Sequence, residues 1–285
     1  MGNPLMGTLA IAGLLALGAC ADNGDASKAA DLDPTSVVDA TDLNDIMLTV
    51  ADPNEAVEYF RSSLTKDPDR TEFRRGLAQS LIRAKRAAEA VPVFEKLVES
   101  KEGTDQDRID FADALIRTND WKGAEAQLNQ VPPTVETYKR YRLEAMIADS
   151  QKKWKKADSF YEIASGLTTK PSNVMNNWGY SKMARGDYKG AEKLFVQAIT
   201  YDRKLFTAKN NLMLARAAQK NYSLPVVPMS ETEKAQMLYT AGLSAVKQGD
   251  TDIGRGLLED AIDTHPRHFE EAVRSLEALT RTIKS

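Results

Sequence analysis

The chain of 285 residues has little of what catalytic, metal-binding and disulfide-linked proteins use. It contains one cysteine, so no internal disulfide can form and the fold must be held by packing. Its two histidines, His265 and His268, could ligate a metal only together with Glu271, and a fourth ligand is missing. No glycine-rich turn follows a strand pattern, which argues against a nucleotide-binding loop. We therefore expect no enzyme activity, no bound metal and no cofactor.

Aromatic residues and an excess of one charge are also scarce. Aromatics make up 7% of a chain that is 42% hydrophobic, a composition that favours close packing of small residues between helices over large sheets. With 38 basic and 41 acidic residues, no basic surplus is available to neutralise phosphates. The composition predicts an all-α protein and makes nucleic acid a poor partner.

The chain begins with an uncharged apolar stretch. Residues 5–17 read LMGTLAIAGLLAL, which fits the core of a signal peptide and is too short to span a bilayer as a mature helix. The LGAC sequence at 17–20 resembles the bacterial lipobox, in which a lipoprotein signal peptidase cleaves before a cysteine that carries diacylglycerol. The resemblance implies a signal peptide over 1–19 and lipidation of Cys20.

A polar and acidic segment follows the cysteine. Residues 20–36 have no apolar period, so we expect a flexible, lipidated tether. Each buried CH₂ of an acyl chain contributes about 0.8 kcal/mol, and two chains make attachment to a membrane stable. Ala21 stands where an Asp would signal inner-membrane retention in some bacteria. We therefore expect lipid anchoring at the periplasmic face of the outer membrane.

A period of about 34 residues organises the rest of the chain. A small residue is followed four positions later by an aromatic or Leu, and three positions after that by another small or apolar residue. Residues with this spacing share one face of a helix, and the small first member lets two helices approach closely. The triplets are Ala56/Phe60/Ser63, Ala90/Phe94/Leu97, Ala124/Leu128/Val131, Ala157/Tyr161/Ala164, Ala191/Phe195/Ala198 and Gly254/Leu258/Ala261.

These triplets resemble the second helices of tetratricopeptide repeats. The first helices match as well, because Ala78, Gly179 and Gly242 each precede a lead residue by the spacing of the small residue at the inter-helix contact. The resemblance covers roughly residues 37–268. It implies an all-α solenoid of helical hairpins, with about five to six repeats and a C-terminal capping helix.

The repeat pattern is interrupted once. Residues 205–222 read as one more first helix, but its expected partner is replaced by a segment in which Pro225 and Pro228 forbid a regular helix. The predicted boundaries are a repeat array over 37–222, a Pro-containing linker over 223–234, and a final hairpin with its capping helix over 235–285. Ser230, with Glu233 three residues later, is a candidate N-cap for that hairpin.

In tetratricopeptide folds the first helices line a concave surface, and the resemblance places a partner-binding groove there. The inward positions carry Arg, Asn and Tyr side chains, which suit hydrogen bonding to an extended or helical segment of a protein. The alternative, that each is an ordinary exposed helix residue, stays open. The groove candidates are Arg75, Gln79, Arg83, Asp113, Arg117, Arg142, Asn173, Asn176, Tyr180 and Asn210. We expect the tryptophans Trp121, Trp154 and Trp178 to belong to the core.

The lipobox, the repeats and the sequence at 176–202 and 214–250 together are similar to the TadD-type assembly lipoproteins of tight-adherence (Tad, or Flp) pili. The resemblance implies an outer-membrane-anchored factor that acts like a pilotin, with the pilus secretin or other pilus assembly components as partners. An alternative is a general periplasmic adaptor for outer-membrane protein assembly or for cell-wall hydrolases. The two alternatives share one architecture and differ in the partner.

Overall fold

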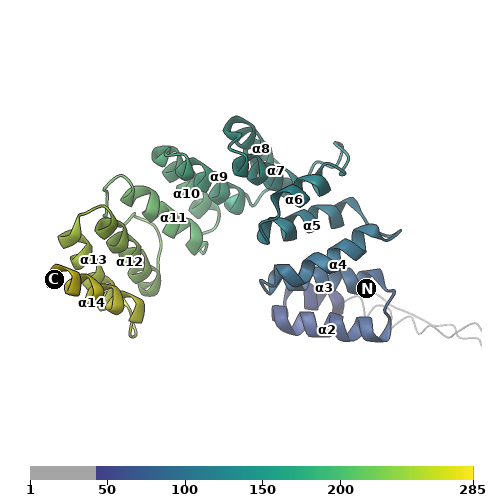
Figure 1. Ribbon diagram of the computed structural model, residues 1–285, viewed down its shortest axis with the longest axis horizontal. Coiled ribbons are helices and arrows are strands. Elements are labelled where there is room, and N and C mark those ends of the chain that lie inside the picture. The colour runs from purple at the N-terminus through teal and green to yellow at the C-terminus, as the bar shows by residue number, and fades with distance from the viewer. Residues whose placement is uncertain (1–42, 285) are drawn as a thin grey trace, which may run out of the picture. The chain divides into compact units, whose positions relative to one another are not determined.

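The structure is a computed structural model that describes residues 43–284, and every regular element in this range is a helix (Figure 1). The expected all-α fold is confirmed. The predicted signal peptide at 1–19, the lipidation site Cys20 and the tether at 20–36 lie outside the described residues. A helix at 43–49 is followed by α2 (Pro53–Lys66), α3 (Thr71–Arg83), α4 (Ala87–Glu99), α5 (Asp105–Arg117), α6 (Trp121–Leu128), α7 (Tyr138–Ser150), α8 (Trp154–Gly166), α9 (Ser172–Ala184), α10 (Tyr188–Tyr201), α11 (Phe206–Ala217), α12 (Glu231–Lys247), α13 (Thr251–Thr264) and α14 (Glu270–Lys284).

Successive helices pair into hairpins that pack on one another within the compact unit Ile46–Ser285. α3 packs with α4, α5 with α6, α7 with α8, α9 with α10, and α12 with α13. The second helix of one hairpin also contacts the first helix of the next. Because each hairpin buries its apolar face only against its neighbours, the core continues from one hairpin to the next. This arrangement is the expected helical-hairpin solenoid.

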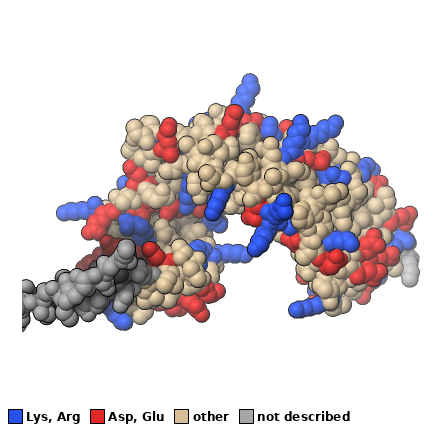
Figure 2. Space-filling model, turned by 180° about the vertical axis from the view of Figure 1, so that it is seen from behind, with Lys and Arg blue, Asp and Glu red and all other residues tan. Residues whose placement is uncertain are grey.

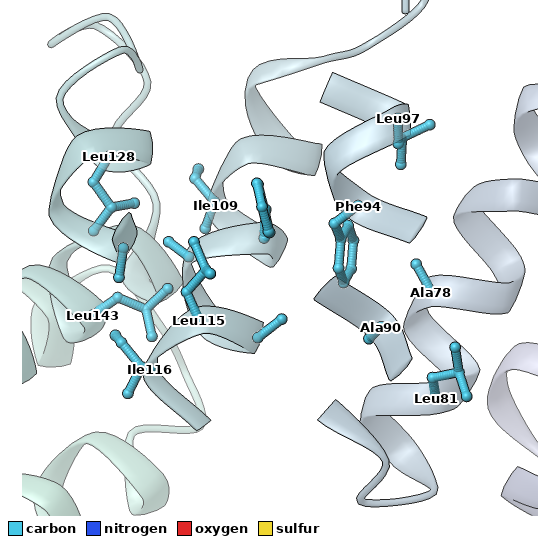
Figure 3. Close-up of a cluster of buried hydrophobic side chains, with 14 of the residues drawn as sticks. Ala78, Leu81, Ala90, Phe94, Leu97, Ile109, Leu115, Ile116, Leu128 and Leu143 are labelled. Carbon is cyan, nitrogen blue, oxygen red and sulfur yellow. The ribbon is translucent and has the colours of Figure 1, made fainter. Parts of the chain in front are cut away.

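The lead and central residues of the sequence triplets lie on the second helices α2, α4, α6, α8, α10 and α13, and all of them are buried. Phe94 is representative. Its side chain on α4 lies between Ala78 of α3 and Ile109 of α5 (Figure 3). Its ring also stacks on Phe111 with centroids 6.2 Å apart. An aromatic ring at this position therefore fills the space between one hairpin and the next.

Close approach of the paired helices depends on small residues in the first helices. Gly179 on α9 faces Phe195 on α10, and a Cβ atom at Gly179 would lie 2.6 Å from Cε1 of that ring. Such a contact is shorter than van der Waals packing allows, so glycine is required for this spacing. This close approach is the physical reason for the small residue that the sequence predicts in the first helix.

The turns inside the hairpins share one conformation. Five of them contain a residue with positive φ directly after the C-cap of the first helix, and the same conformation follows α11. These residues are Lys85, Asn119, Lys152, Gly186, Gly249 and Lys220, with φ between 56° and 85°. The expected glycine turn at Gly186 is present, with φ of 83°. Lysine and asparagine adopt the same conformation elsewhere, which makes this turn hard to recognise from the sequence.

The interruption predicted after α11 is present. Residues 221–230 form no helix, and the segment is held down because Pro225 is buried while Leu224 and Val227 pack against the hydrophobic core. α12 then begins at Glu231, inside the range 223–234 that we expected to be a linker. The reason is local: Ser230 Oγ accepts the amide of Glu233, and the Glu233 carboxylate accepts the amide of Ser230, which forms a capping box.

The final hairpin packs directly on α11, and the two are joined by both apolar and charged contacts. Met213 and Ala217 of α11 form a buried cluster with Met237 and Ala241 of α12. Lys209 Nζ lies 2.9 Å from Glu233 Oε1, and only 3% of the lysine side chain is exposed. The final hairpin is therefore part of the same stack as the preceding repeats.

The last helix covers the end of the array. α14 packs against α13 and buries Ala272, while Phe269 is buried just before the helix begins. The capping helix expected at 268–283 thus corresponds to α14. None of the helices within residues 43–284 is both long and apolar enough to cross a membrane.

Candidate partner-binding surface

Seven of the ten groove candidates form hydrogen bonds or ion pairs within the chain. The centre of these contacts is a row of three carboxylates on one face of α5, Asp107, Asp110 and Asp113, whose spacing of three residues places them on successive turns. All three are buried. A buried carboxylate requires a partner, and here the partners come from the first helices on either side.

Arg75 pairs with the first of these carboxylates. Its Nε lies 2.7 Å from Oδ1 of Asp107, and its Nη2 lies 2.9 Å from Oδ2. Burial by itself raises the pKa of Asp107, but hydrogen bonds from Arg75 and Thr104 outweigh burial and hold that pKa below its ordinary value. This bidentate pair links α3 to α5 and identifies Arg75 as an inter-repeat contact.

The other two carboxylates are shared between α3, α5 and α7. Lys139 Nζ lies 2.7 Å from Oδ1 of Asp110 and 3.5 Å from Oδ2 of Asp113. Gln79 donates to Asp110 at 3.2 Å, and Arg117 donates to Asp113 at 3.1 Å. Burial raises the pKa of Asp113, but the charges of Lys139 and Arg117 outweigh it and lower that pKa. Gln79, Asp113 and Arg117 are therefore committed to contacts within the chain.

Arg83 and Arg142 differ in how their guanidinium groups are used. Arg83 donates to the carbonyl oxygens of Met47 and Ala51, each at 2.8 Å, and so ties α3 to the segment before α2. The Nε of Arg142 is buried without a hydrogen-bond partner. The charge of Arg142 acts on Asp113 and Tyr161 without forming an ion pair within 4.0 Å among residues 43–284. Arg142 is thus a groove arginine whose guanidinium forms no ion pair in the described part of the chain.

Two further candidates, Asn176 and Tyr180, line a cavity of about 510 Å³ that we call the aromatic cavity. Its lining comes from α6, α7, α8, α9 and α11. The residues are Trp121, Met146, Asp149, Ser150, Trp154, Tyr161, Asn176, Asn177, Tyr180, Ser181, Ala184, Thr207 and Asn211. Cavities of about 300–1,000 Å³ are the size that holds a small molecule or a few side chains of a partner.

Amide side chains from neighbouring first helices meet at this cavity. Asn211 Nδ2 donates to Asn176 Oδ1 at 3.0 Å, and Asn177 Nδ2 lies 3.4 Å from the sulfur of Met146. The remaining candidates lie outside the cavity lining: Asn173 is exposed, and Asn210 accepts a hydrogen bond from Thr240 Oγ1 at 2.7 Å. Of the predicted groove residues, Asn176 and Tyr180 lie around the aromatic cavity, and Gln79 and Arg83 line a separate cavity of about 240 Å³.

Asp149 is the carboxylate in the cavity lining. Its Oδ1 accepts a hydrogen bond from Ser181 at 2.7 Å, and its Oδ2 accepts one from Tyr161 at 2.9 Å. Burial raises the pKa of Asp149 by more than these hydroxyl groups lower it. Burial and the bond to Asp149 also raise the pKa of Tyr161 far above its ordinary value, so the phenol is a hydrogen-bond donor. Asp149 forms no ion pair within 4.0 Å in the described part of the chain.

Trp121 and Trp178 pack against the hydrophobic core as expected, and Trp121 also lines the aromatic cavity together with Trp154. Trp178 stacks on Tyr161 at 6.2 Å, and its Nε1 donates to Asp158 at 2.6 Å, as a packed residue would. Trp121 and Trp154 are half-buried and line the aromatic cavity. Both stand first in their second helices, directly after the hairpin turn. That position is the sequence signal that could have identified them.

The histidines form no site. His265 Nδ1 lies 2.8 Å from the carbonyl oxygen of Arg267, and its ring packs on Phe269 with centroids 4.9 Å apart. Within residues 43–284 no group of three or more His, Cys, Asp and Glu side chains could hold a metal ion.

Basic and acidic side chains are interspersed over the face that Figure 2 shows, with uncharged surface between them. This distribution agrees with the small net charge of −3.

A sequence profile of the tetratricopeptide repeat matches residues 48–108 and 81–147. No curated protein matches the chain. The profile matches cover the helices from α2 to most of α7, which include the carboxylate row of α5 and part of the aromatic cavity.

Solved structures share the fold at low sequence identity. A chain of the APC/C hetero-tetramer Cut9–Hcn1 aligns with a TM-score of 0.60 and 13% identity, covering 83% of this chain and 48% of that one. The human IFIT1 dimer with PPP-AAAA gives 0.60 and 15%, covering 81% and 60%. A tetratricopeptide repeat protein from Parabacteroides merdae gives 0.55 and 11%, covering 86% and 99%. The chain thus spans about half the length of the first of these proteins and 60% of the second, and the likeness to all three concerns the fold.

Proposed function

Because this chain is a tetratricopeptide-repeat protein, we propose that it acts by binding a segment of a protein partner, with the aromatic cavity as the principal contact. Tetratricopeptide-repeat domains are in general protein-binding scaffolds rather than catalysts. Each hairpin supplies one first helix to a shared face, so a ligand can contact several repeats at once. The proposal places the partner on the face formed by α7, α9 and α11.

The observation that carries the proposal is the composition of the cavity lining. Trp121, Trp154 and Tyr180 provide large apolar surfaces that still present polar atoms, the residue types that dominate binding energy at protein interfaces. Tyr180 is 58% exposed, so its ring is accessible to a bound partner. Asn176 and Asn211 place amide groups beside these rings, where they can pair with the main chain of a bound segment.

The finer proposal concerns the location and the partner. The lipobox at 17–20 and the similarity to tight-adherence pilus lipoproteins support a lipid anchor on Cys20 at the periplasmic face of the outer membrane. The partner is then the pilus secretin or another pilus assembly component. Anchoring confines the protein and its partner to one surface, which raises the effective concentration of the partner.

The experiment is crosslinking and affinity capture from membranes of the native host. Wild type is compared with Cys20→Ser and with Tyr180→Ala. The matched control for the cavity is Tyr201→Ala, since Tyr201 at the end of α10 is also 58% exposed and lies outside the cavity lining. We expect Cys20→Ser to lose membrane association and secretin multimers. Tyr180→Ala should lose the captured partner, whereas Tyr201→Ala should keep it.

Other outcomes would change the assignment. Capture of outer-membrane assembly factors or cell-wall hydrolases, with pili unaffected, would favour the general periplasmic adaptor. If Tyr180→Ala and Tyr201→Ala capture the same proteins in the same amounts, the aromatic cavity is not the binding site. Membrane association that survives in Cys20→Ser would remove the lipid anchor from the proposal.

A further inference from the structure

We propose that the aromatic cavity binds a cationic side chain of the partner, an arginine above all, with Asp149 as its counter-ion and Trp154 and Tyr180 stacking against it. This inference rests on the proposed function, since it names the chemistry that the partner presents to the same cavity. It explains why a lining that exposes mostly apolar surface includes a carboxylate with which no cation among residues 43–284 forms an ion pair.

The carboxylate of Asp149 has hydrogen-bond acceptor positions that remain unused. Each carboxylate oxygen can accept about two hydrogen bonds, and each oxygen of Asp149 accepts one, from Ser181 or from Tyr161. The two hydroxyl donors hold the carboxylate in place and leave one position on each oxygen. A guanidinium group donates two parallel N–H bonds, which matches this pair of open positions.

Within the described part of the chain, no cation forms an ion pair with Asp149. Asp158 pairs with Arg185 at 2.5 Å and with Lys182 at 3.4 Å. The charge of Arg185 reaches Asp149 from a distance, and Arg142 acts on Asp113 and Tyr161. The pKa of Asp149 is nevertheless raised, because burial outweighs its two hydrogen bonds and the charge of Arg185. A cation brought by a partner would compensate the carboxylate charge further.

The exposed lysines near the cavity do not cancel the negative charge of Asp149. Lys152 and Lys153 lie in the turn between α7 and α8, next to Trp154, and both are exposed. Exposed charges are screened by water and salt, whereas the carboxylate is half-buried and screened much less. Asp149 therefore acts on a ligand cation in the cavity more strongly than these two lysines do.

Two helices have their C-terminal ends at the cavity. α7 ends at Ser150 and α9 ends at Ala184, and both residues line the cavity. The C-terminal end of a helix carries a partial negative charge that favours a cation nearby, by about 0.3–1 kcal/mol at an exposed site. Two helix ends and one carboxylate therefore present negative potential to the same space.

The shape and polarity of the lining suit an arginine side chain. Arginine has an apolar stem and a charged end, so it can cover aromatic surface while its guanidinium reaches a carboxylate. Indole rings are the aromatic groups that attract a cation most strongly. Trp154 already interacts with one, since the guanidinium carbon of Arg185 lies 5.8 Å from its ring centroid. The indole ring of Trp121 also lines the cavity.

The test is a fluorescence titration of the full chain, which reports on Trp121 and Trp154 in the cavity. The probes are N-acetyl-arginine amide, its neutral isostere N-acetyl-citrulline amide, and N-acetyl-leucine amide. The variants are Asp149→Asn and, as a matched removal of one negative charge, Glu162→Gln. Glu162 is exposed on α8 in the same hairpin and does not line the cavity.

For wild type and Glu162→Gln we expect saturable binding of the arginine probe, with the citrulline probe weaker by about tenfold, as loss of one charge-assisted pair implies. Asp149→Asn should lose this preference. Tyr180→Ala provides a second variant with an exposed side chain, and it should weaken the arginine probe without unfolding the protein.

Equal binding of the arginine, citrulline and leucine probes would overturn the proposal, as would an arginine preference that survives in Asp149→Asn or the absence of any saturable change. The proposed function fails separately. If partner capture still depends on Tyr180 while the arginine probe does not bind, the cavity is a protein-binding site for an uncharged side chain. If the arginine probe binds and no partner is captured, the cation site stands and the scaffold function does not.

Discussion

Tyr161 on α8 donates a hydrogen bond to Asp149 on α7, with 2.9 Å between the phenol and carboxylate oxygens. The tyrosine is 1% exposed, so its hydroxyl requires this partner. Ser181 on α9 donates to the other carboxylate oxygen at 2.7 Å. One carboxylate thus joins three helices at the aromatic cavity, and the stability of this part of the fold is coupled to the chemistry of the candidate site.

The first prediction is the pH dependence of Asp149. Its pKa is raised in the folded state, so the folded chain binds this proton more tightly than the unfolded chain does. The free energy of unfolding should therefore fall as the pH rises from the ordinary Asp pKa of about 3.9 through the raised folded value. In urea unfolding at a series of pH values, the free energy of unfolding of Asp149→Asn should increase relative to that of wild type across this pH window. A difference independent of pH would contradict the prediction.

Asp107 should behave in the opposite way. Its pKa is lowered by Arg75 and Thr104, so its contribution is present above the ordinary Asp pKa and is lost as the pH falls through the lower folded value. We expect Asp107→Asn to reduce the free energy of unfolding at neutral pH by about 2–3 kcal/mol, as loss of a charged, buried pair implies. The difference in the free energy of unfolding between Asp107→Asn and wild type should become smaller below about pH 3.9. Glu89→Gln, which breaks exposed ion pairs with Arg61 and Arg86, should show no measurable deficit.

The third prediction tests the close approach of α9 and α10. Gly179→Ala places a Cβ atom 2.6 Å from the ring of Phe195, so the helices must separate or the ring must move. We expect a loss of about 1–3 kcal/mol in the free energy of unfolding. Gly256→Ala on α13 is the matched control, because a Cβ atom there meets nothing within 4 Å. That variant should gain about 0.5–1 kcal/mol from helix propensity, and equal effects of the two substitutions would contradict the packing argument.

The fourth prediction concerns the attachment of the final hairpin to α11. Glu233→Gln keeps the capping side chain but leaves the buried Lys209 without a counter-ion, which should destabilise α12 and α13 by about 2–3 kcal/mol. Lys209→Met removes the buried charge and should remain within about 1 kcal/mol of wild type. Amide hydrogen exchange of α12 is the appropriate measurement, because the tryptophans lie at 121, 154 and 178, far from it in the sequence. Faster exchange in both variants alike would show that the charge pair itself stabilises the contact.

Much of the fold follows from local sequence features. The triplet around Phe94 predicts its helix because small and aromatic residues at that spacing share one helical face. Ser230 and Glu233 predict the start of α12 because both partners of a capping box lie within one turn. The conformation at Gly186 is local for the same reason. These interactions involve neighbours in the sequence, so the chain alone determines them.

The candidate site is different, because its contacts join residues from different repeats. Arg75 and Arg142 both read as groove residues, but the position of Asp107, 32 residues from Arg75, decides that only Arg75 is paired. Trp154 reads as core, yet the spacing between α7 and α9 leaves its ring on a cavity beside Asp149. Composition and period determine that this protein is a stack of helical hairpins. Only the tertiary structure decides which polar groups meet partners within the chain and which remain open to a ligand, because that depends on distances between helices that no local pattern sets.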